Sequence, residues 1–167
     1  TGIGANAFQN KTQITSVTIG NSVTTIGASA FSGCNKLVSV SISNSVTTIG
    51  ESAFYACIRL KTINIPNSLQ VINSYTFRAC ENLENLIFPA SITHINSFAT
   101  YYCYRLKNVV FLGLVPIIVN ENFEGGNPPA TENVLYNVGL NVLRPICIVL
   151  LIEASITDLL NTLKPVI

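Results

Sequence analysis

The sequence predicts an α/β-type repeat solenoid, in which short coils of chain stack and place their strands side by side. The segment NSVTTIGASAF at 21–31 returns as NSVTTIGESAF at 44–54, with Ala28 changed to Glu51. At the same period of 23 residues, Phe, Cys and Leu recur in fixed columns. One unit buries about seven apolar side chains at roughly 2 kcal/mol each, whereas ordering it costs roughly 1–2 kcal/mol for every residue. Each coil therefore needs its neighbours, and repetition gives every coil the same surface to present.

The columns predict which side chains face the core. Alternating apolar pairs mark a short strand with one inward face. These pairs are Val17/Ile19, Val40/Ile42, Ile63/Ile65, Leu86/Phe88 and Val109/Phe111. Further apolar columns hold Phe8, Phe31, Phe54 and Phe77, then Cys34, Cys57, Cys80 and Cys103, then Ile14, Leu37, Leu60, Leu83 and Leu106, and pairs three apart such as Val23/Ile26. Thr100 interrupts the Phe column, and we expect Phe98, in preference to Tyr101, to turn inward and fill the gap.

One column alternates between two residue types that tolerate a positive φ. It holds Gly4, Gly27, Gly50, Asn73 and Asn96. Glycine and asparagine adopt left-handed backbone more readily than other residues. The column therefore predicts a left-handed residue at this turn of every coil.

The combined pattern is I-G-x-x-A-F-x-x-C-x-x-L-x-x-V-x-I, with NSVTTIG between strands. It resembles the BspA-like leucine-rich repeats of surface proteins from bacteria and protists. The resemblance covers residues 1–126, or five to six coils with the first one incomplete. It implies a right-handed coil stack with one parallel β-sheet and few or short helices. Such proteins are commonly cell-surface or secreted and virulence-associated, so the resemblance implies a non-catalytic module for adhesion or protein–protein interaction.

Residues 127–167 lack the repeat, and we expect them to cap the last coil. The run at 133–136 predicts one more strand. The apolar run at 146–152 is too short for a membrane span, which needs about 20 apolar residues, so it predicts another buried strand. Ser155 and Asp158 form a capping box ahead of Leu159, Leu160 and Leu163 at helical spacing, which predicts a short helix at about 156–163.

The N-terminus has no such cap, because Thr1 aligns with Thr24 in the middle of a coil. We expect further coils upstream in the native protein. The alternative to a binding module is a structural one, an assembly or spacer whose coils stack end to end through the bare edge of the first coil.

Composition excludes several classes of partner and chemistry. Formal net charge is +1 and no basic cluster is present, which argues against nucleic acid and anionic membranes as partners. No nucleophile elbow, P-loop or dinucleotide-binding motif occurs, and the only histidine, His94, is expected to be solvated. We therefore expect no enzyme activity and no cofactor. Asn10 begins the only glycosylation sequon.

The cysteine column does not predict a metal site. Coils about 4.8 Å apart place Cys34 and Cys103 roughly 14 Å from each other, whereas zinc needs its sulfurs at about 2.3 Å. Parallel side-chain directions also disfavour disulfides between neighbouring coils. We expect these cysteines, and Cys147, to be reduced and buried in the core.

Two features are candidates for binding a protein or glycan ligand, such as extracellular matrix. The first is the outer face of the sheet, where small polar residues give way to an apolar stripe of Ile87, Val110 and Leu135. The second is an aromatic cluster of Tyr55, Tyr75, Phe98, Tyr101, Tyr102 and Tyr104. The alternatives are that the tail covers the stripe and that the aromatic residues repack locally. The candidate contacts are Ile87, Val110, Asn85, Asn108, Asn64, Tyr75, Tyr101 and Tyr102.

Overall fold

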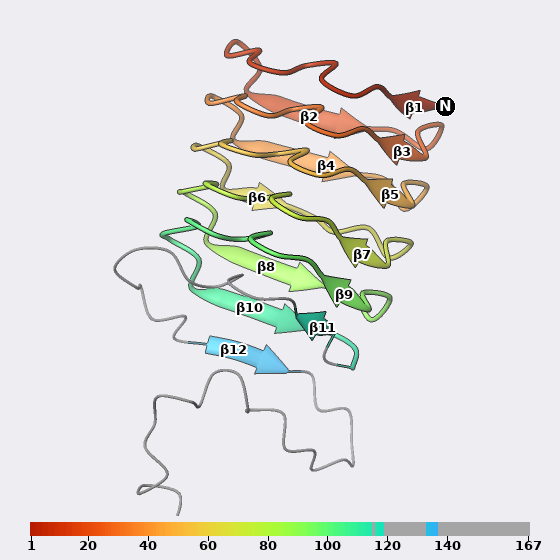
Figure 1. Ribbon diagram of the computed structural model, residues 1–167, viewed down its shortest axis with the longest axis vertical. Helices are drawn as coiled ribbons and strands as arrows, with labels where there is room; N and C mark the ends of the chain where they lie inside the picture. Colours follow the sequence, from red (N-terminus) through yellow and green to blue (C-terminus); the bar gives the residue numbers. More distant parts are fainter. Residues whose placement is uncertain (115, 119–132, 137–167) are drawn as a thin grey trace, which may run out of the picture. The chain divides into compact units, whose positions relative to one another are not determined.

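The computed structural model describes residues 1–114 and 116–118, together with the backbone of 133–136. They form a parallel β-solenoid whose coils follow one another at the predicted period (Figure 1). No helix occurs among these described residues. The predicted strand at 133–136 is confirmed as β12 (Asn133–Tyr136). The rest of the predicted cap within 127–167, with its strand at 146–152 and its helix at about 156–163, lies outside the described residues.

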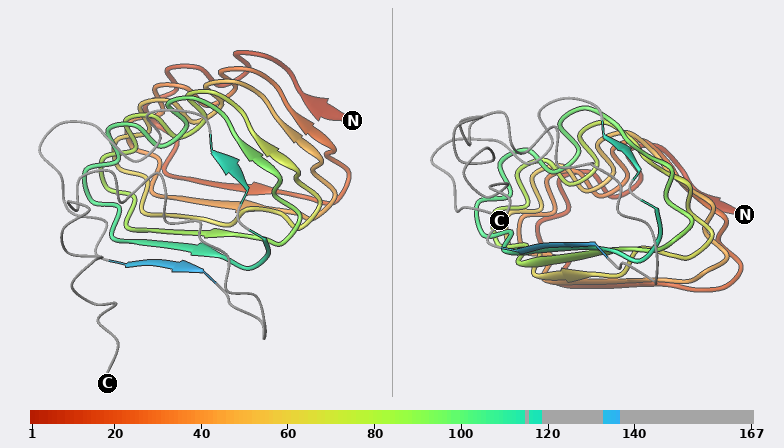
Figure 2. Two further views of the ribbon diagram at one scale, coloured as in Figure 1. Left: turned by 60° about the horizontal axis from the view of Figure 1, so that its bottom comes forward. Right: turned by 90° about the horizontal axis from the view of Figure 1, so that it is seen from below.

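Each coil contributes two strands, which line two different sides of the coil (Figure 2). The long-strand row consists of β2 (Ser16–Ile19), β4 (Ser39–Ile42), β6 (Thr62–Ile63), β8 (Asn85–Phe88), β10 (Asn108–Phe111) and β12. The short-strand row consists of β1 (Gly2–Ile3), β3 (Thr25–Ile26), β5 (Thr48–Ile49), β7 (Val71–Ile72), β9 (His94–Ile95) and β11 (Ile117–Ile118). The segments that run from each short strand to the next long strand form the third side, called here the turn side.

The expectation of one parallel sheet is wrong. The pairs three residues apart end in two-residue strands, which build a second row of their own. Each row is also divided in two, so that the sheet orders are β2-β4-β6 and β8-β10-β12 in one row and β1-β3-β5 and β7-β9-β11 in the other. Both divisions fall between the coil that carries β5 and β6 and the coil that carries β7 and β8.

Proline accounts for part of this division. In an undivided step the residue after the long strand donates to the neighbouring coil, as the Ser43 N–H does to the Ile19 carbonyl at 3.1 Å. Pro66 and Pro89 occupy the same position in the coils of β6 and β8, and proline has no N–H to donate. The long-strand row therefore loses a backbone bond on each side of β6.

The turn side keeps its backbone bonds where the strand rows are divided. Phe54 N–H donates to the Thr76 carbonyl at 2.9 Å, and Ala56 N–H donates to the Arg78 carbonyl at 2.8 Å. The same ladder joins the earlier coils, as in the 2.8 Å bond from Phe31 N–H to the Ala53 carbonyl. The turn side therefore holds the two halves of the stack together.

The predicted apolar columns form the core. Phe8, Phe31, Phe54 and Phe77 stack ring on ring, with centroids 5.1, 5.4 and 5.9 Å apart along the column. The leucine column from Leu37 to Leu106 and all four cysteines of the repeat are buried beside them. Such columns bury each coil's apolar edge against the next coil, which is the main stabilisation available to a repeat.

The expectation that Phe98 fills the gap left by Thr100 is wrong. Thr100 is itself buried, with 2% exposure. Phe98 is half-buried outside the core and stacks on Tyr75, with ring centroids 5.4 Å apart. The ring stays in its own column because the residue one coil earlier offers it an aromatic face.

The predicted position of the left-handed residue is also wrong. None of Gly4, Gly27, Gly50, Asn73 and Asn96 has a positive φ. The left-handed residues instead fall in two later columns, which hold Asn6, Ser29, Ser52, Tyr75 and Phe98, and Asn10, Gly33, Ala56, Ala79 and Tyr102. Glycine at positions 27 and 50 serves close approach, because a Cβ there would lie 2.5 Å from the backbone nitrogen of Ala5 or Ala28.

Candidate functional site

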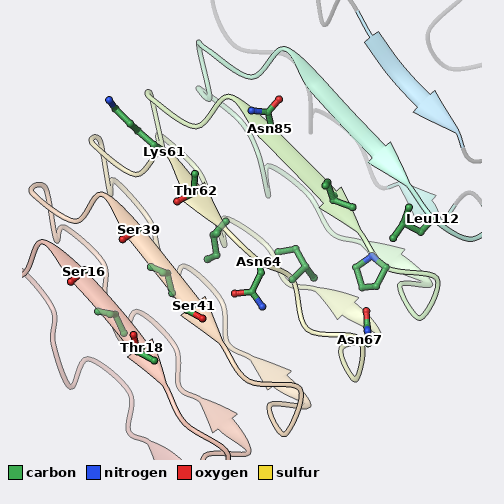
Figure 3. Close-up of a pocket in the computed structure, with 16 residues that line it drawn as sticks. Ser16, Thr18, Ser39, Ser41, Lys61, Thr62, Asn64, Asn67, Asn85 and Leu112 are labelled. Atoms are coloured by element: carbon green, nitrogen blue, oxygen red, sulfur yellow. The ribbon is translucent and has the colours of Figure 1, made fainter.

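The outer face of the long-strand row carries a shallow hollow of about 680 Å³ (Figure 3). It lies across β2, β4, β6 and β8, whose alternate residues point outward from the sheet. Its lining residues are Ser16, Val17, Thr18, Ser39, Val40, Ser41, Lys61, Thr62, Ile63, Asn64, Ile65, Asn67, Asn85, Ile87, Pro89 and Leu112. The hollow thus offers hydroxyl and amide groups at one end and apolar side chains at the other.

The apolar end of the hollow is strongly exposed. Ile87 is 54% exposed and Leu112 is 46% exposed. They follow the small polar side chains of β2 and β4 along the stack, as Figure 3 shows for Ser16, Ser39 and Leu112. Both side chains line the hollow, so its apolar end offers surface that a ligand can cover.

Asn64, a predicted partner contact, lines the hollow and also holds the sheet together. Its Nδ2 donates to the Ile42 carbonyl at 2.7 Å, and its Oδ1 accepts from the Ile42 N–H at 2.7 Å. The donation replaces the one that Pro66 cannot make to that carbonyl. The side chain therefore has a structural role that its place in the outward-facing column did not reveal.

The remaining predicted contacts of this face divide between the hollow and the next strand. Asn85 and Ile87 line the hollow, whereas Asn108 and Val110 lie beside them on β10, in register. Asn108 Nδ2 donates to Asn85 Oδ1 at 2.6 Å, and Val110 is half-buried. Val110 is in register with Leu135 of β12 as well, so the backbone positions of the predicted apolar stripe are adjacent.

The predicted aromatic residues lie on the turn side, where they surround Arg78. The centre of its guanidinium group lies 5.4 Å from the ring centroids of Tyr75 and Tyr102, 5.5 Å from Tyr101, 5.9 Å from Phe98 and 6.0 Å from Tyr55. Tyr104 joins the group through Tyr102, at 5.7 Å between centroids. We call Arg78 and these six aromatic residues the Arg78 patch.

The rings of the Arg78 patch also contact one another. Phe98 meets Tyr101 edge-on at 5.3 Å, and the rings of Tyr101 and Tyr102 lie 4.1 Å apart. Tyr55 and Tyr104 remain 38% and 41% exposed. Arg78 is half-buried, and its Nε has no hydrogen-bond partner among the described residues.

Three members of the Arg78 patch have left-handed backbone. The φ angles are 60° at Tyr75, 59° at Phe98 and 64° at Tyr102. For a residue with a bulky side chain this conformation costs roughly 1–2 kcal/mol. Earlier coils use asparagine, serine, glycine or alanine at the same positions, so the aromatic rings are placed here at the expense of stability.

The cysteines form a hydrogen-bonded column inside the stack. Each thiol donates to the carbonyl of the phenylalanine 26 residues earlier, as Cys57 does to Phe31 and Cys80 to Phe54 at 3.2 Å. All four described cysteines are free and buried. Burial raises the pKa of the Cys103 thiol to about 12 and that of Cys80 well above its ordinary value, with neighbouring thiols adding to the latter shift. Such thiols are poor nucleophiles.

Other chemistry-bearing groups do not converge. His94 is half-buried in β9, and its Nδ1 lies 2.9 Å from Thr93 Oγ1. No group of three histidine, cysteine or acidic side chains suited to a metal ion occurs within the described part of the chain. In the same residues no helix is long and apolar enough to cross a membrane.

Sequence reasoning missed several residues of these surfaces. Lys61 and Leu112 line the hollow from positions just before and just after long strands, which the strand pattern did not assign to either face. Arg78 was missed although its column otherwise holds Gln9, Ser32, Tyr55 and Tyr101. The sequence does contain a signal for this contact: Arg78 stands between Tyr55 and Tyr101 in one column, which favours a cation–π contact.

Comparison with known proteins agrees with this architecture. A family model described as the BspA type leucine rich repeat region matches residues 1–127 in six copies. No curated protein matches the chain.

Solved structures show the same fold. The leucine rich repeat protein of T. pallidum is 28% identical, with a TM-score of 0.65, over 71% of this chain and 65% of its own. A leucine rich cell surface protein from Faecalibacterium prausnitzii is 24% identical, with a TM-score of 0.56, over 75% of this chain and 36% of its own. The present chain thus spans less than two thirds of either protein.

Proposed function

Because this chain belongs to the BspA type leucine rich repeat family, we propose that it is a non-catalytic binding module that holds a protein or glycan ligand on its long-strand row. The observation that carries the proposal is the hollow across β2 to β8, with exposed Ile87 at one end.

The lining of the hollow suits a ligand with both polar and apolar groups. Ser16, Thr18, Ser39 and Ser41 present hydroxyl groups that both donate and accept. Ile87 and Leu112 add apolar surface that gains from being covered. Backbone bonds join β2, β4 and β6 beneath the polar end of the hollow, which lowers the entropy cost of recognition at that end.

The proposal includes a cellular role. The module acts at the cell surface or after secretion, and its ligand belongs to the extracellular matrix or to another cell, as the family resemblance implies. The long-strand row presents mostly uncharged polar groups, which suits broad and shallow contact with a ligand. Catalysis needs convergent acid, base or nucleophilic groups instead.

The test is capture of matrix proteins and a glycan panel by the immobilised protein. Ile87→Asp places a charge in the hollow, and Ile58→Asp is the matched control, because Ile58 is 36% exposed and does not line the hollow. We expect capture by the wild type and by Ile58→Asp, and a loss of about tenfold or more in affinity for Ile87→Asp. Circular dichroism and thermal melting establish that each variant is folded.

The outcomes separate the proposal from its rival. Equal capture by all three proteins would move the ligand away from the hollow. No capture by folded wild type would favour assembly or a spacer role, which light scattering separates by a mass that grows with concentration. Antibody labelling of intact cells tests the location, and labelling only after lysis would contradict it.

A further inference from the structure

The Arg78 patch holds a positive charge whose observed partners are aromatic rings. Five ring centroids lie within 6.0 Å of the guanidinium centre. The buried Nε donates to no acceptor among the described residues. Rings stabilise a cation through their quadrupoles but leave its charge in place. An unsatisfied buried donor is uncommon enough in proteins to need an explanation.

The patch is built from several coils at once. Tyr55, Arg78 and Tyr101 share one column, so the guanidinium lies between tyrosines of the preceding and following coils. Tyr75 and Phe98 stack in a second column beside it. The first two coils carry Asn6, Ser29, Gln9 and Ser32 in these columns. The patch is therefore a local addition to a regular scaffold.

Bulky residues occupy left-handed positions in the patch. The conformation itself belongs to the repeat, since all five described coils have left-handed residues in these two columns. What is particular to the patch is that Tyr75, Phe98 and Tyr102 occupy these positions, although smaller residues adopt such φ values with less strain. The patch also differs from the core, since Tyr55 and Tyr104 stay well exposed.

Charge points to the nature of the partner. The formal net charge of the whole chain is only +1, so the attraction for an anionic group is local and comes from the guanidinium of Arg78. Tyrosine and arginine are, moreover, among the residue types enriched at the energetic centres of protein interfaces.

We propose that the Arg78 patch is a second binding site, which docks a partner-protein segment that presents an aspartate or glutamate carboxylate to the Arg78 guanidinium. The surrounding rings exclude water from the ion pair and pack against the apolar atoms beside the carboxylate. Charge-assisted hydrogen bonds to arginine are stronger than neutral ones, and their planar geometry adds specificity. This site is on the turn side and is independent of the hollow on the long-strand row.

The first experiment is selection from a random displayed peptide library against the folded protein. The wild type is expected to enrich peptides with Asp or Glu above their frequency in the library. Arg78→Gln removes the central charge, and Arg59→Gln is the matched control, because Arg59 is an exposed arginine of the turn side that is not part of the patch. We expect Arg59→Gln to enrich the same peptides and Arg78→Gln to lose them.

A second measurement assigns the contact to the carboxylate. Five of the six tyrosines lie in the patch and the chain has no tryptophan, so intrinsic tyrosine fluorescence reports on this site. The enriched peptide is titrated against each protein beside its Glu→Gln or Asp→Asn counterpart. The neutral peptide is expected to bind the wild type about tenfold more weakly. Arg78→Gln is expected to make the two peptides equal.

Several results would overturn the assignment. They are enrichment of no peptide by folded wild type, enrichment without acidic residues, and unchanged selection by Arg78→Gln. If Arg78→Gln fails to fold, Tyr55→Ser takes its place, since Ser32 occupies that position one coil earlier. Unchanged peptide affinity of Tyr55→Ser would count against the site. Binding of sialylated or uronic-acid glycans without acidic peptides would assign the patch to carbohydrate. Ile87→Asp is expected to keep peptide affinity, so failure of the hollow and failure of the patch are distinguishable.

Discussion

The side chain of Asn64 completes the backbone of Ile42, one coil earlier, through two hydrogen bonds of 2.7 Å. One bond satisfies the N–H of Ile42 and the other satisfies its carbonyl. Pro66, which follows in the coil of Asn64, has no N–H to contribute. An amide side chain therefore continues the pairing of β4 and β6 just beyond Ile63, the last residue of β6.

Asn64→Ala is expected to destabilise the protein by about 2 kcal/mol, because two groups of buried Ile42 lose their partner. Ser41→Ala, an exposed position one coil earlier, is expected to change stability by less than about 0.5 kcal/mol. Urea unfolding followed by circular dichroism measures both. Equal stability of the two variants would show that water satisfies Ile42 as well as Asn64 does.

Phe54→Ala should cost about 3–5 kcal/mol, since the ring is fully buried between Phe31 and Phe77. Phe8→Ala removes the same atoms from a position that is 39% exposed, and we expect less than half of that loss. Thermal melting of the pair compares them. A larger loss at Phe8 would contradict the location of the core.

The left-handed column predicts opposite effects for two reciprocal substitutions. Ala79→Gly relieves a φ of 59° and is expected to stabilise the protein by about 0.5–1 kcal/mol. Gly33→Ala is expected to destabilise it, because φ is 72° and the new Cβ would collide with the side chain of Asn10. Differential scanning calorimetry of both variants checks the signs, and a stabilising Gly33→Ala would refute the assigned conformation.

Stability should fall at alkaline pH because of the buried cysteines. The pKa of Cys103 rises from an ordinary 9.0 to about 12 in the folded state, mainly through burial. The folded protein thus holds this proton more tightly than the unfolded chain does. The stabilisation is complete below pH 9 and is lost as pH rises from 9 towards 12. Urea unfolding at pH 8 and pH 10.5 measures the loss.

Cys103→Ala serves as the control for this pH dependence, since it removes one titrating thiol. Its unfolding free energy is expected to fall less between pH 8 and pH 10.5 than that of the wild type, although the variant is less stable at pH 8 because it leaves a cavity. An identical fall in both proteins would mean that other groups cause the alkaline loss.

The repeat made most of the fold predictable from sequence. A period of 23 residues placed the long strands from β2 to β10 and the phenylalanine, cysteine and leucine columns, because each coil has to bury the same edge. The short-strand row was not foreseen, since a two-residue strand such as β3 is too short for a periodic signal. The division of the long-strand row depends in part on Pro89, which has no N–H to donate to the coil of β6. At the division of the short-strand row the side chain of Asn73 bonds to Ile49, and such contacts between coils leave no periodic signal.

The candidate surfaces were predicted in part. Asn64, Asn85 and Ile87 line the hollow because alternate strand residues share one face. The sequence predicts the aromatic cluster, because tyrosines replace smaller residues in its columns, but it does not predict Arg78 at the centre of that cluster. Contacts between side chains of different columns depend on the three-dimensional path of each coil. The alignment of repeats gives the sequence positions but not that path.

The division of both strand rows at one step makes that step different from the others in how the coils are joined. At the steps on either side of the division, all three sides of the coil carry hydrogen bonds and stiffen one another. Between β5 and β7, and between β6 and β8, backbone–backbone bonds persist on the turn side, as in the bond from Phe54 to Thr76. The short-strand row is joined across this step by a side chain, since Asn73 Nδ2 donates to the Ile49 carbonyl at 2.7 Å. A single side-chain bond resists bending less than a ladder of strands does, so we expect a lateral force on the stack to bend it first at this step.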